Sequence, residues 1–203
     1  YEQFKQDKKL ENIWYEKCKK LPEKQTDCEI INAVARPDKT GGSCASVAFA
    51  YVGRKNGIDV SDFRGGDSQY FFASKKNKVE LFKALNVRTI HENSMKTSLS
   101  NGKRALRQCE QGKEYYLSVG DHASIVRKND DGVLQYLELQ SLACGWKNFG
   151  DVDDTLKWRF GCKSSSRYIA DAYMTDIAQL KGNKEFEDLL GYINTGATDK
   201  GKV

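Results

Sequence analysis

The chain has 203 residues, 39% of them hydrophobic, and a formal net charge of +5, which together favour a globular protein that can bury a core. No apolar run approaches the roughly 20 residues of a membrane span, and no signal-peptide pattern follows the first residues, so we expect neither segment. No nucleic-acid reader motif accompanies the mildly basic charge, and we expect no nucleic acid among the partners. The first residue is Tyr1 rather than Met, which suggests an excised domain or a processed product.

The first part of the chain, residues 1–40, is expected to be helical. Apolar residues at helical spacing predict an amphipathic helix over 1–20, which ends before Pro22 because the residue preceding a proline is pushed away from the helical region. A Thr-Asp pair can then cap a short second helix over 28–34. Turn-forming residues at 36–42 change the direction of the chain.

A cysteine at the start of a predicted helix is the most informative single feature. Gly41, Gly42 and Ser43 form a turn, and small and apolar residues then recur at helical spacing from Cys44 until Gly57. The first N–H groups of a helix have no internal partner and carry a partial positive charge, which favours a thiolate there over a thiol. Cys44 can therefore be a nucleophile, although a lone cysteine at this place can also be a small core residue.

Several short elements are expected between this helix and residue 113. They are a strand at 58–63, a loop at 64–68, a helix at 79–85, a strand at 87–90 and a helical segment at 94–109 interrupted around 101–102. The aromatic run 70–72 is expected to belong to the core rather than to a groove wall. His91 is expected at the surface.

Residues 114–140 predict an antiparallel meander, because apolar positions alternate or run together in three segments. The segment 129–132 between the last two is a hairpin turn. His122 stands at the start of the middle strand. Farther on, 156–160 is expected to add a strand, 168–192 to form two helical segments, and the residues after 194 to fray.

A helix-opening cysteine followed much later by a histidine on a strand is the layout of papain-like cysteine enzymes. The imidazole takes the thiol proton and later returns it to the leaving amine, and a third group holds the ring in one tautomer. Glu138 and Gln140 lie two residues apart on the strand expected to pair with that of His122, so they share one face and either can reach the ring.

The sequence also resembles the papain-fold toxin domains found at the carboxyl termini of bacterial polymorphic toxins, over about residues 31–62 and 113–141. The matching stretches are Ile31-Asn32, Gly41-Gly42-Ser43-Cys44, Ala50, Arg54-Lys55, Gly57, Asp59-Val60, Gly120-Asp121-His122-Ala123, Asp131-Gly132-Val133 and Leu137-Glu138-Leu139-Gln140. The resemblance implies that Cys44 is the nucleophile, His122 the base and Glu138 the orienting acid.

The same resemblance gives Gln140, Ser43 and Asn32 as possible orienting or substrate-binding residues. Three positions depart from the family pattern: Ser43 replaces the usual Asn, Glu138 replaces an Asp, and Val47 stands where a second cysteine is common. None of these changes removes the Cys-His pair.

The resemblance further implies an α+β, papain-like fold in which the nucleophile's helix packs on an antiparallel sheet, with additional N- and C-terminal helices. We expect one domain over 1–203, divided into an N-terminal helical region at 1–40, a catalytic core at 41–140 and a C-terminal strand and helices at 141–203.

The six cysteines include no C-x-x-C pair, and with two histidines the sequence predicts neither a metal nor a cofactor. Most cysteines are expected to be free thiols, and Cys18 with Cys28 is the disulfide candidate to test first.

Thiol attack on a carboxamide or peptide carbonyl gives an acyl-thioester. The carbonyl that is attacked, and whether water or an amine then reacts with the thioester, decide which reaction is catalysed. The resemblance implies protein glutamine deamidation by a secreted effector that is delivered as part of a larger protein, with a protein substrate and a possible cognate immunity protein. The alternatives are a transglutaminase, a cysteine peptidase, a peptidoglycan amidase, or an inactive papain-like binding module.

Overall fold

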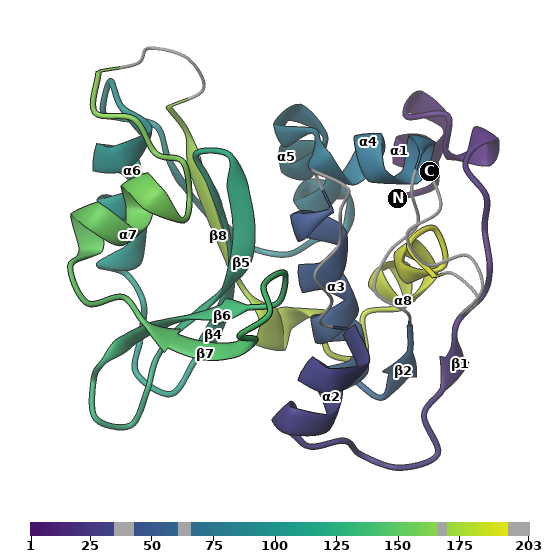
Figure 1. Cartoon of the computed structure of the whole chain (residues 1–203). Helices are drawn as coiled ribbons and strands as arrows, with labels where there is room; N and C mark the ends of the chain where they lie inside the picture. Colours follow the sequence, from purple (N-terminus) through teal and green to yellow (C-terminus); the bar gives the residue numbers. More distant parts are fainter. Residues whose placement is uncertain (35–42, 61–65, 166–169, 195–203) are drawn as a thin grey trace. The chain divides into compact units, whose positions relative to one another are not determined.

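The computed structural model describes residues 1–34, 43–60, 66–165 and 170–194 (Figure 1). Within these ranges the chain forms eight α-helices, a six-stranded antiparallel sheet and a two-stranded sheet, which confirms the expected α+β class. The predicted turn at 36–42 and the predicted fraying after residue 194 lie outside the described residues, as do positions 64 and 65 of the loop expected at 64–68. The last two positions of that loop belong to helix α4 (Asp67–Ala73) instead.

The chain divides into two compact units, each built from segments far apart in the sequence. The first unit comprises Tyr1–Val87, Leu139–Gly145 and Gln179–Val203, and the second comprises Arg88–Glu138 and Trp146–Ala178. Neither unit coincides with the sequential regions 1–40, 41–140 and 141–203, because the chain crosses between the units several times. The expected single domain stays a prediction.

The first unit is mainly helical and contains the small sheet. Its elements are α1 (Glu2–Asp7), the 3-10 helix η1 (Leu10–Asn12), β1 (Lys19–Lys20), α2 (Asp27–Val34), α3 (Cys44–Lys55), β2 (Ile58–Asp59), α4 (Asp67–Ala73), α5 (Lys75–Ala84) and α8 (Lys184–Leu190). Thr26 and Glu29 form a reciprocal capping box at the start of α2, which confirms the predicted short helix.

Helix α3 is the core of the first unit. All residues from Ala45 to Gly53 are buried, as expected for a helix that is apolar on every side. The ring of Phe49 packs edge-to-face on Phe72, Phe82 and Phe186 at 5.9 to 6.2 Å, so α4, α5 and α8 all contact α3. Helix α3 begins at Cys44, which confirms the predicted helix start.

The prediction of one helix over 1–20 is wrong. Helix α1 ends at Asp7, Lys9 adopts a left-handed conformation, and the chain is extended before it reaches β1. Backbone contacts with distant segments replace helical ones, because Glu16 N–H donates to the carbonyl of Gly191 at 2.9 Å. Trp14, one of the apolar residues in that helical pattern, is consequently 69% exposed.

The aromatic run 70–72 lies on α4, where Phe71 and Phe72 are buried as predicted. Tyr70, in contrast, is 72% exposed. The structure therefore places two of the three rings in the core.

The second unit is organised around the large sheet, whose strand order is β3-β8-β4-β5-β6-β7. Its elements are β3 (Thr89–Glu92), α6 (Ser98–Leu106), β4 (Glu114–Val119), β5 (His122–Lys128), β6 (Leu134–Glu138), β7 (Gly145–Asn148), α7 (Val152–Trp158) and β8 (Ala172–Asp176). The 3-10 helix η2 (Ile177–Leu180) follows β8. The meander β4-β5-β6 confirms the prediction, including the hairpin turn, where Asn129 N–H donates to the carbonyl of Val133.

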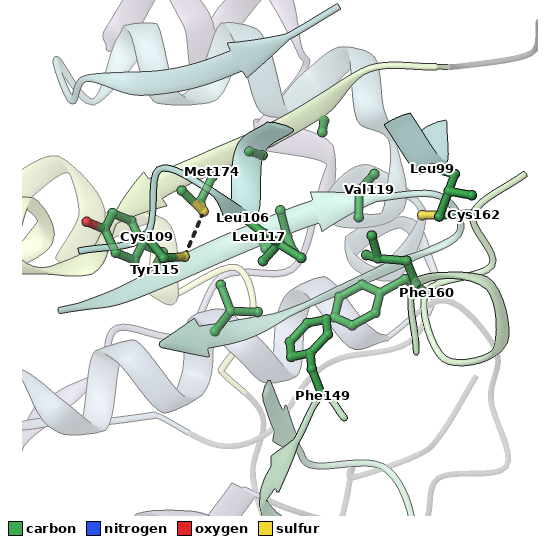
Figure 2. Close-up of a cluster of buried hydrophobic side chains, with 14 residues drawn as sticks. Leu99, Leu106, Cys109, Tyr115, Leu117, Val119, Phe149, Phe160, Cys162 and Met174 are labelled. Atoms are coloured by element: carbon green, nitrogen blue, oxygen red, sulfur yellow. Dashed lines mark hydrogen bonds between the residues drawn. The ribbon is translucent and has the colours of Figure 1, made fainter. Parts of the chain in front are cut away.

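Helices α6 and α7 cover one face of this sheet (Figure 1). Leu99 and Leu106 of α6 and Leu156 of α7 enclose a buried cluster with Leu117 and Val119 of β4 (Figure 2). Alternate residues of β4 face this cluster, as the period of a strand requires.

Three predictions in the second unit are wrong. Residues 156–160 belong largely to helix α7, which Asp151 caps by accepting a hydrogen bond from Asp154 N–H at 2.9 Å. Residues 172–176, within the stretch 168–192 that was expected to form two helical segments, form strand β8 between β3 and β4, whereas η2 and α8 in the same stretch are helical. Helix α6 runs unbroken through 101–102, where the buried Asn101 amide donates to the backbone carbonyls of Met95 and Ala170.

Candidate active site

Cys44 is the first residue of α3 and is partly exposed. The first helical hydrogen bond runs from Val47 N–H to the carbonyl of Ser43 at 3.0 Å, so the N–H groups of Cys44 and Ala45 precede the ladder of the helix. The thiol therefore stands at the end of the helix where the backbone dipoles carry a partial positive charge.

Ser43, the residue before the nucleophile, is completely buried. Its hydroxyl accepts a hydrogen bond from the Nε2 amide of Gln140 at 3.0 Å. Two residues that the family resemblance assigned to the site, 97 positions apart in the chain, therefore meet next to Cys44 within the first unit. This contact fixes the backbone that presents the thiol.

A buried lysine, Lys78, interacts electrostatically with Cys44, although it was not predicted from the sequence as a site residue. Lys78 of α5 is buried, and burial lowers the pKa of its ammonium group to about 8. Electrostatic interaction with Cys44 opposes this shift, and Lys75 reinforces it. The signal in the sequence was the helical spacing of positions 78, 81 and 82, which puts a lysine on an otherwise apolar face.

His122 opens β5 and lies opposite Val119 of β4. Directly paired residues of neighbouring strands share a face, so the imidazole lies on the face that α6 and α7 cover. Its ring packs edge-to-face on Phe160 at 5.2 Å. The two-residue turn before it has Gly120 at a φ of 58°, the conformation in which glycine is favoured at the first position of a II′ hairpin.

Glu138 ends β6 and is buried, and the Arg159 guanidinium binds both of its carboxylate oxygens, one of them at 2.8 Å. By the register of β5 and β6, Glu138 shares the sheet face of His122. Strand β6 ends at Glu138, so Gln140 does not lie on the strand that pairs with that of His122, and the expectation that Glu138 and Gln140 share one strand face is wrong. The structure adds Arg159 as a partner of Glu138, which the sequence did not predict because Arg159 follows α7, a segment expected to be a strand.

The predicted site residues fall into both units. Ser43, Cys44, Gln140 and Asn32 belong to the first unit, and His122 and Glu138 belong to the second. Asn32 is exposed on α2, and its amide donates weakly to the sulfur of Cys28 at 3.7 Å. The pairing of Cys44 with His122 stays a prediction.

All six cysteines are free thiols, so no disulfide joins Cys18 to Cys28. Burial raises the pKa of Cys18 and of Cys109 to about 12. Those two thiols therefore stay protonated at neutral pH, which separates them chemically from a nucleophile at a helix start.

Within the described ranges, no group of three or more His, Cys, Asp or Glu side chains could hold a metal ion. No helix in the described part of the chain has the length and apolar character that a membrane crossing requires. Comparisons of the chain with family models, curated proteins and solved structures find no match. The family resemblance therefore rests on the motifs around Cys44 and His122 alone.

Proposed function

We propose that the chain is a papain-like cysteine hydrolase of the toxin class that converts glutamine to glutamate in a target protein. The observation that carries the proposal is the contact of Gln140 with Ser43, directly before Cys44 at the start of α3. A buried, hydrogen-bonded turn in front of a helix-opening thiol is the preorganisation that a nucleophile needs.

The proposed reaction has two steps. The Cys44 thiolate attacks the carboxamide carbon of a glutamine side chain, and the C–N bond breaks as the nitrogen leaves as ammonia with a proton from the His122 imidazolium. Water, deprotonated by His122, then attacks the acyl-thioester, so that glutamate leaves and the thiolate is restored. The backbone N–H of Cys44 is the natural donor to the oxyanion of both tetrahedral intermediates.

The proposal includes the setting that the resemblance implies. The domain would be an effector delivered into a target cell as part of a larger protein, and a cognate immunity protein would cover Cys44. Neither the larger delivering protein nor the immunity protein is needed for the chemistry, so each can be tested separately from the reaction.

A second candidate, an inactive binding module, is favoured by a specific observation in the second unit. The carboxylate of Glu138 is held by Arg159, and the ring of His122 packs on Phe160. Both contacts suit structural roles for the two residues that the enzyme proposal uses as acid and base.

Thiol reactivity distinguishes the two candidates. The chain would be treated with limiting iodoacetamide near neutral pH, and each cysteine quantified by mass spectrometry. An enzyme should alkylate Cys44 well ahead of the exposed Cys28, and His122→Ala should remove that preference. Similar rates at Cys44 and Cys28 in the unmodified chain would support the binding module.

Expression in bacteria then identifies the reaction. Wild type, Cys44→Ala and the matched control Cys28→Ala would be compared by growth and by whole-proteome mass spectrometry. We expect toxicity and glutamine-to-glutamate conversions that are absent only in Cys44→Ala. New protein termini would instead indicate a peptidase, lysis that needs periplasmic targeting would indicate a cell-wall amidase, and equal toxicity of all three chains would reject a cysteine-dependent enzyme.

A further inference from the structure

The segment that follows α7, residues 159–162, has a backbone fixed by that helix. Arg159 N–H donates to the carbonyl of Thr155 at 2.8 Å. Cys162 N–H donates to the carbonyl of Leu156 at 2.9 Å, which closes the end of the helix. Side chains of this segment therefore leave a backbone whose direction is set.

Phe160 connects this segment to the start of β5. Its ring packs edge-to-face on the imidazole of His122, with the ring centres 5.2 Å apart. Its carbonyl accepts a hydrogen bond of 2.7 Å from the N–H of Asp121, the residue before His122. Arg159 directly precedes Phe160, so its backbone is held close to His122 within the second unit.

Arg159 binds Glu138 by two hydrogen bonds. Its Nε and Nη2 groups donate to the two carboxylate oxygens, the second at 2.8 Å. The planar guanidinium fits a carboxylate in this way, so the pair fixes the direction of the carboxylate as well as its charge. Each oxygen keeps a further lone pair, so Glu138 can still accept another hydrogen bond.

His122 and Glu138 are neighbours on one face of the sheet. The register of β5 and β6 puts both side chains on that face. The strands stay together beyond their paired residues, since the hydroxyl of Ser124 donates to the carbonyl of Leu137 at 2.6 Å. Continued along both strands, the register makes His122 and Glu138 diagonal neighbours, whose separation is about 7–8 Å.

Tyr136 of β6 lies on the same face and shows how the two charges act there. Its ring also packs on Phe160, at 6.0 Å. The pKa of Tyr136 is raised, first by burial and then by the Glu138 carboxylate, while the Arg159 guanidinium opposes the rise. A titratable group in contact with Phe160 thus responds to the two charges in opposite directions.

The other elements around His122 contribute mainly apolar side chains. Val119 of β4 lies opposite it, and α6 and α7 add leucines to the same cluster. Lys103 of α6 and Asp153 of α7 pair with each other at 2.7 Å, outside that cluster. The charged or titratable residues on the turn, strand and segment that adjoin His122 are Asp121, Tyr136, Glu138, Arg159 and Cys162.

We propose that Arg159 is a positioning residue for His122, which fixes the direction of the Glu138 carboxylate and cancels its charge. The proposal rests on the proposed function in taking His122 as the base. A base must be neutral before it accepts a proton, and an unopposed carboxylate nearby favours the protonated ring. Arg159 acts through Glu138 and touches no reacting atom.

The test is an NMR titration of the histidine rings in the full chain, which contains only His91 and His122. His91 lies on β3, which β8 and β4 separate from β5, so it is the internal reference. Arg159→Gln removes the charge and keeps a hydrogen-bond donor. Arg159→Lys keeps the charge.

Arg159→Gln should raise the titration midpoint of His122 by about 0.5–1 pH unit, because the carboxylate loses its counter-charge. Arg159→Lys should stay within about 0.2 pH unit of wild type, and adding Glu138→Gln to Arg159→Gln should restore the wild-type midpoint. The midpoint of His91 should stay constant throughout. A folded Arg159→Gln chain with the wild-type midpoint of His122 would overturn the proposal.

Two controls separate charge from loosened packing. Lys157→Met removes an exposed positive charge of α7. Phe149→Leu removes a buried ring that stacks on Phe160 at 5.9 Å (Figure 2). Both variants should leave the His122 midpoint within about 0.2 pH unit of wild type. A shift in Phe149→Leu as large as that in Arg159→Gln would assign the effect to packing and reject the role of Arg159.

If Arg159→Gln does not fold, Glu138→Gln gives the reciprocal measurement. This change removes the carboxylate and leaves the guanidinium unopposed, so the His122 midpoint should fall by about 0.5–1 pH unit. An unchanged midpoint in Glu138→Gln would contradict the proposal.

The titration reads the imidazole and not turnover, so the two proposals can fail separately. A chain that deamidates no protein, but whose His122 midpoint depends on Arg159, retains the role of Arg159 and rejects the deamidase. A chain whose toxicity requires Cys44, with a His122 midpoint indifferent to Arg159, rejects the role of Arg159 alone.

Discussion

The Nε2 amide of Gln140 donates a hydrogen bond of 3.0 Å to the hydroxyl of Ser43, so the residue directly before Cys44 is fixed by one that follows it 97 positions later. Gln140→Leu removes the donor and leaves the buried hydroxyl without this bond. We expect a loss of about 1–3 kcal/mol in the free energy of unfolding, measured by urea denaturation.

The matched control for that variant is the double variant Ser43→Ala, Gln140→Leu, compared with each single change. Removing both polar partners should cost less than the sum of the single changes, because no hydroxyl is then left to satisfy. Strict additivity in this double-mutant cycle would show that the two side chains do not stabilise each other.

The ion pair of Glu138 with Arg159 gives a second prediction. Glu138 is buried, so Arg159→Met leaves a carboxylate without its partner, and we expect the free energy of unfolding to fall by about 3 kcal/mol. Lys157→Met, an exposed change on the same helix, should stay within about 0.5 kcal/mol. Adding Glu138→Leu to Arg159→Met should recover much of the loss, and a further loss instead would contradict the pairing.

The carboxylate of Asp188 predicts a pH dependence of stability. It accepts hydrogen bonds from the hydroxyls of Tyr1 and Tyr15 and from the ammonium of Lys5, at 2.8 to 3.2 Å. Partial burial alone would raise the pKa of Asp188, but these bonds outweigh it and hold the pKa below its ordinary value.

A carboxyl whose pKa is lowered by folding stabilises the folded chain above its unfolded-state pKa of about 4, and this stability is lost as the pH falls through the lower, folded-state value. Asp188→Asn should therefore lower the free energy of unfolding at neutral pH by about 2 kcal/mol and flatten its decline in acid. Asp7→Asn, an exposed change in α1, is the control. Parallel acid profiles for wild type and Asp188→Asn would contradict the prediction.

The turn before His122 gives a fourth prediction. Gly120 has a φ of 58°, and a Cβ added there would collide with the carbonyl oxygen of Phe160 and lie 2.9 Å from the backbone nitrogen of Cys162. Gly120→Ala should lower the free energy of unfolding by about 3 kcal/mol, through strain and close contact together. Thermal unfolding followed by circular dichroism measures the change.

Gly132→Ala separates those two causes. Gly132 also has a positive φ, 76°, but nothing lies within 4 Å of an added Cβ. This change should cost only about 1 kcal/mol, the penalty of the left-handed conformation itself. Equal losses in the two variants would show that contact with the segment after Phe160 does not matter.

Local patterns in the sequence predicted the elements whose signals lie within a few residues. The capping pair before α2, the small-residue start of α3 and the turn at 129–132 each specify a structure through neighbouring backbone groups, and each is present. The candidate nucleophile was found in this way, because a helix start is a local property of the chain.

The remaining features depend on partners far away in the sequence. Residues 13–20 keep a helical pattern, yet they are held extended by the hydrogen bond of Glu16 to Gly191 and by the pairing of β1 with β2. Strand β8 forms because β3 and β4 offer their edges on both sides, and no periodicity within 172–176 records that.

The sequence by itself determined that a cysteine opens a buried helix and that a histidine opens a strand of a meander. Only the tertiary structure decided that Gln140 meets Ser43, that Glu138 is held by Arg159, and that a lysine of α5 is buried. The physical reason is that helix starts and hairpins are stabilised by adjacent backbone groups, whereas burial and charge pairing are set by whichever side chains the fold brings together.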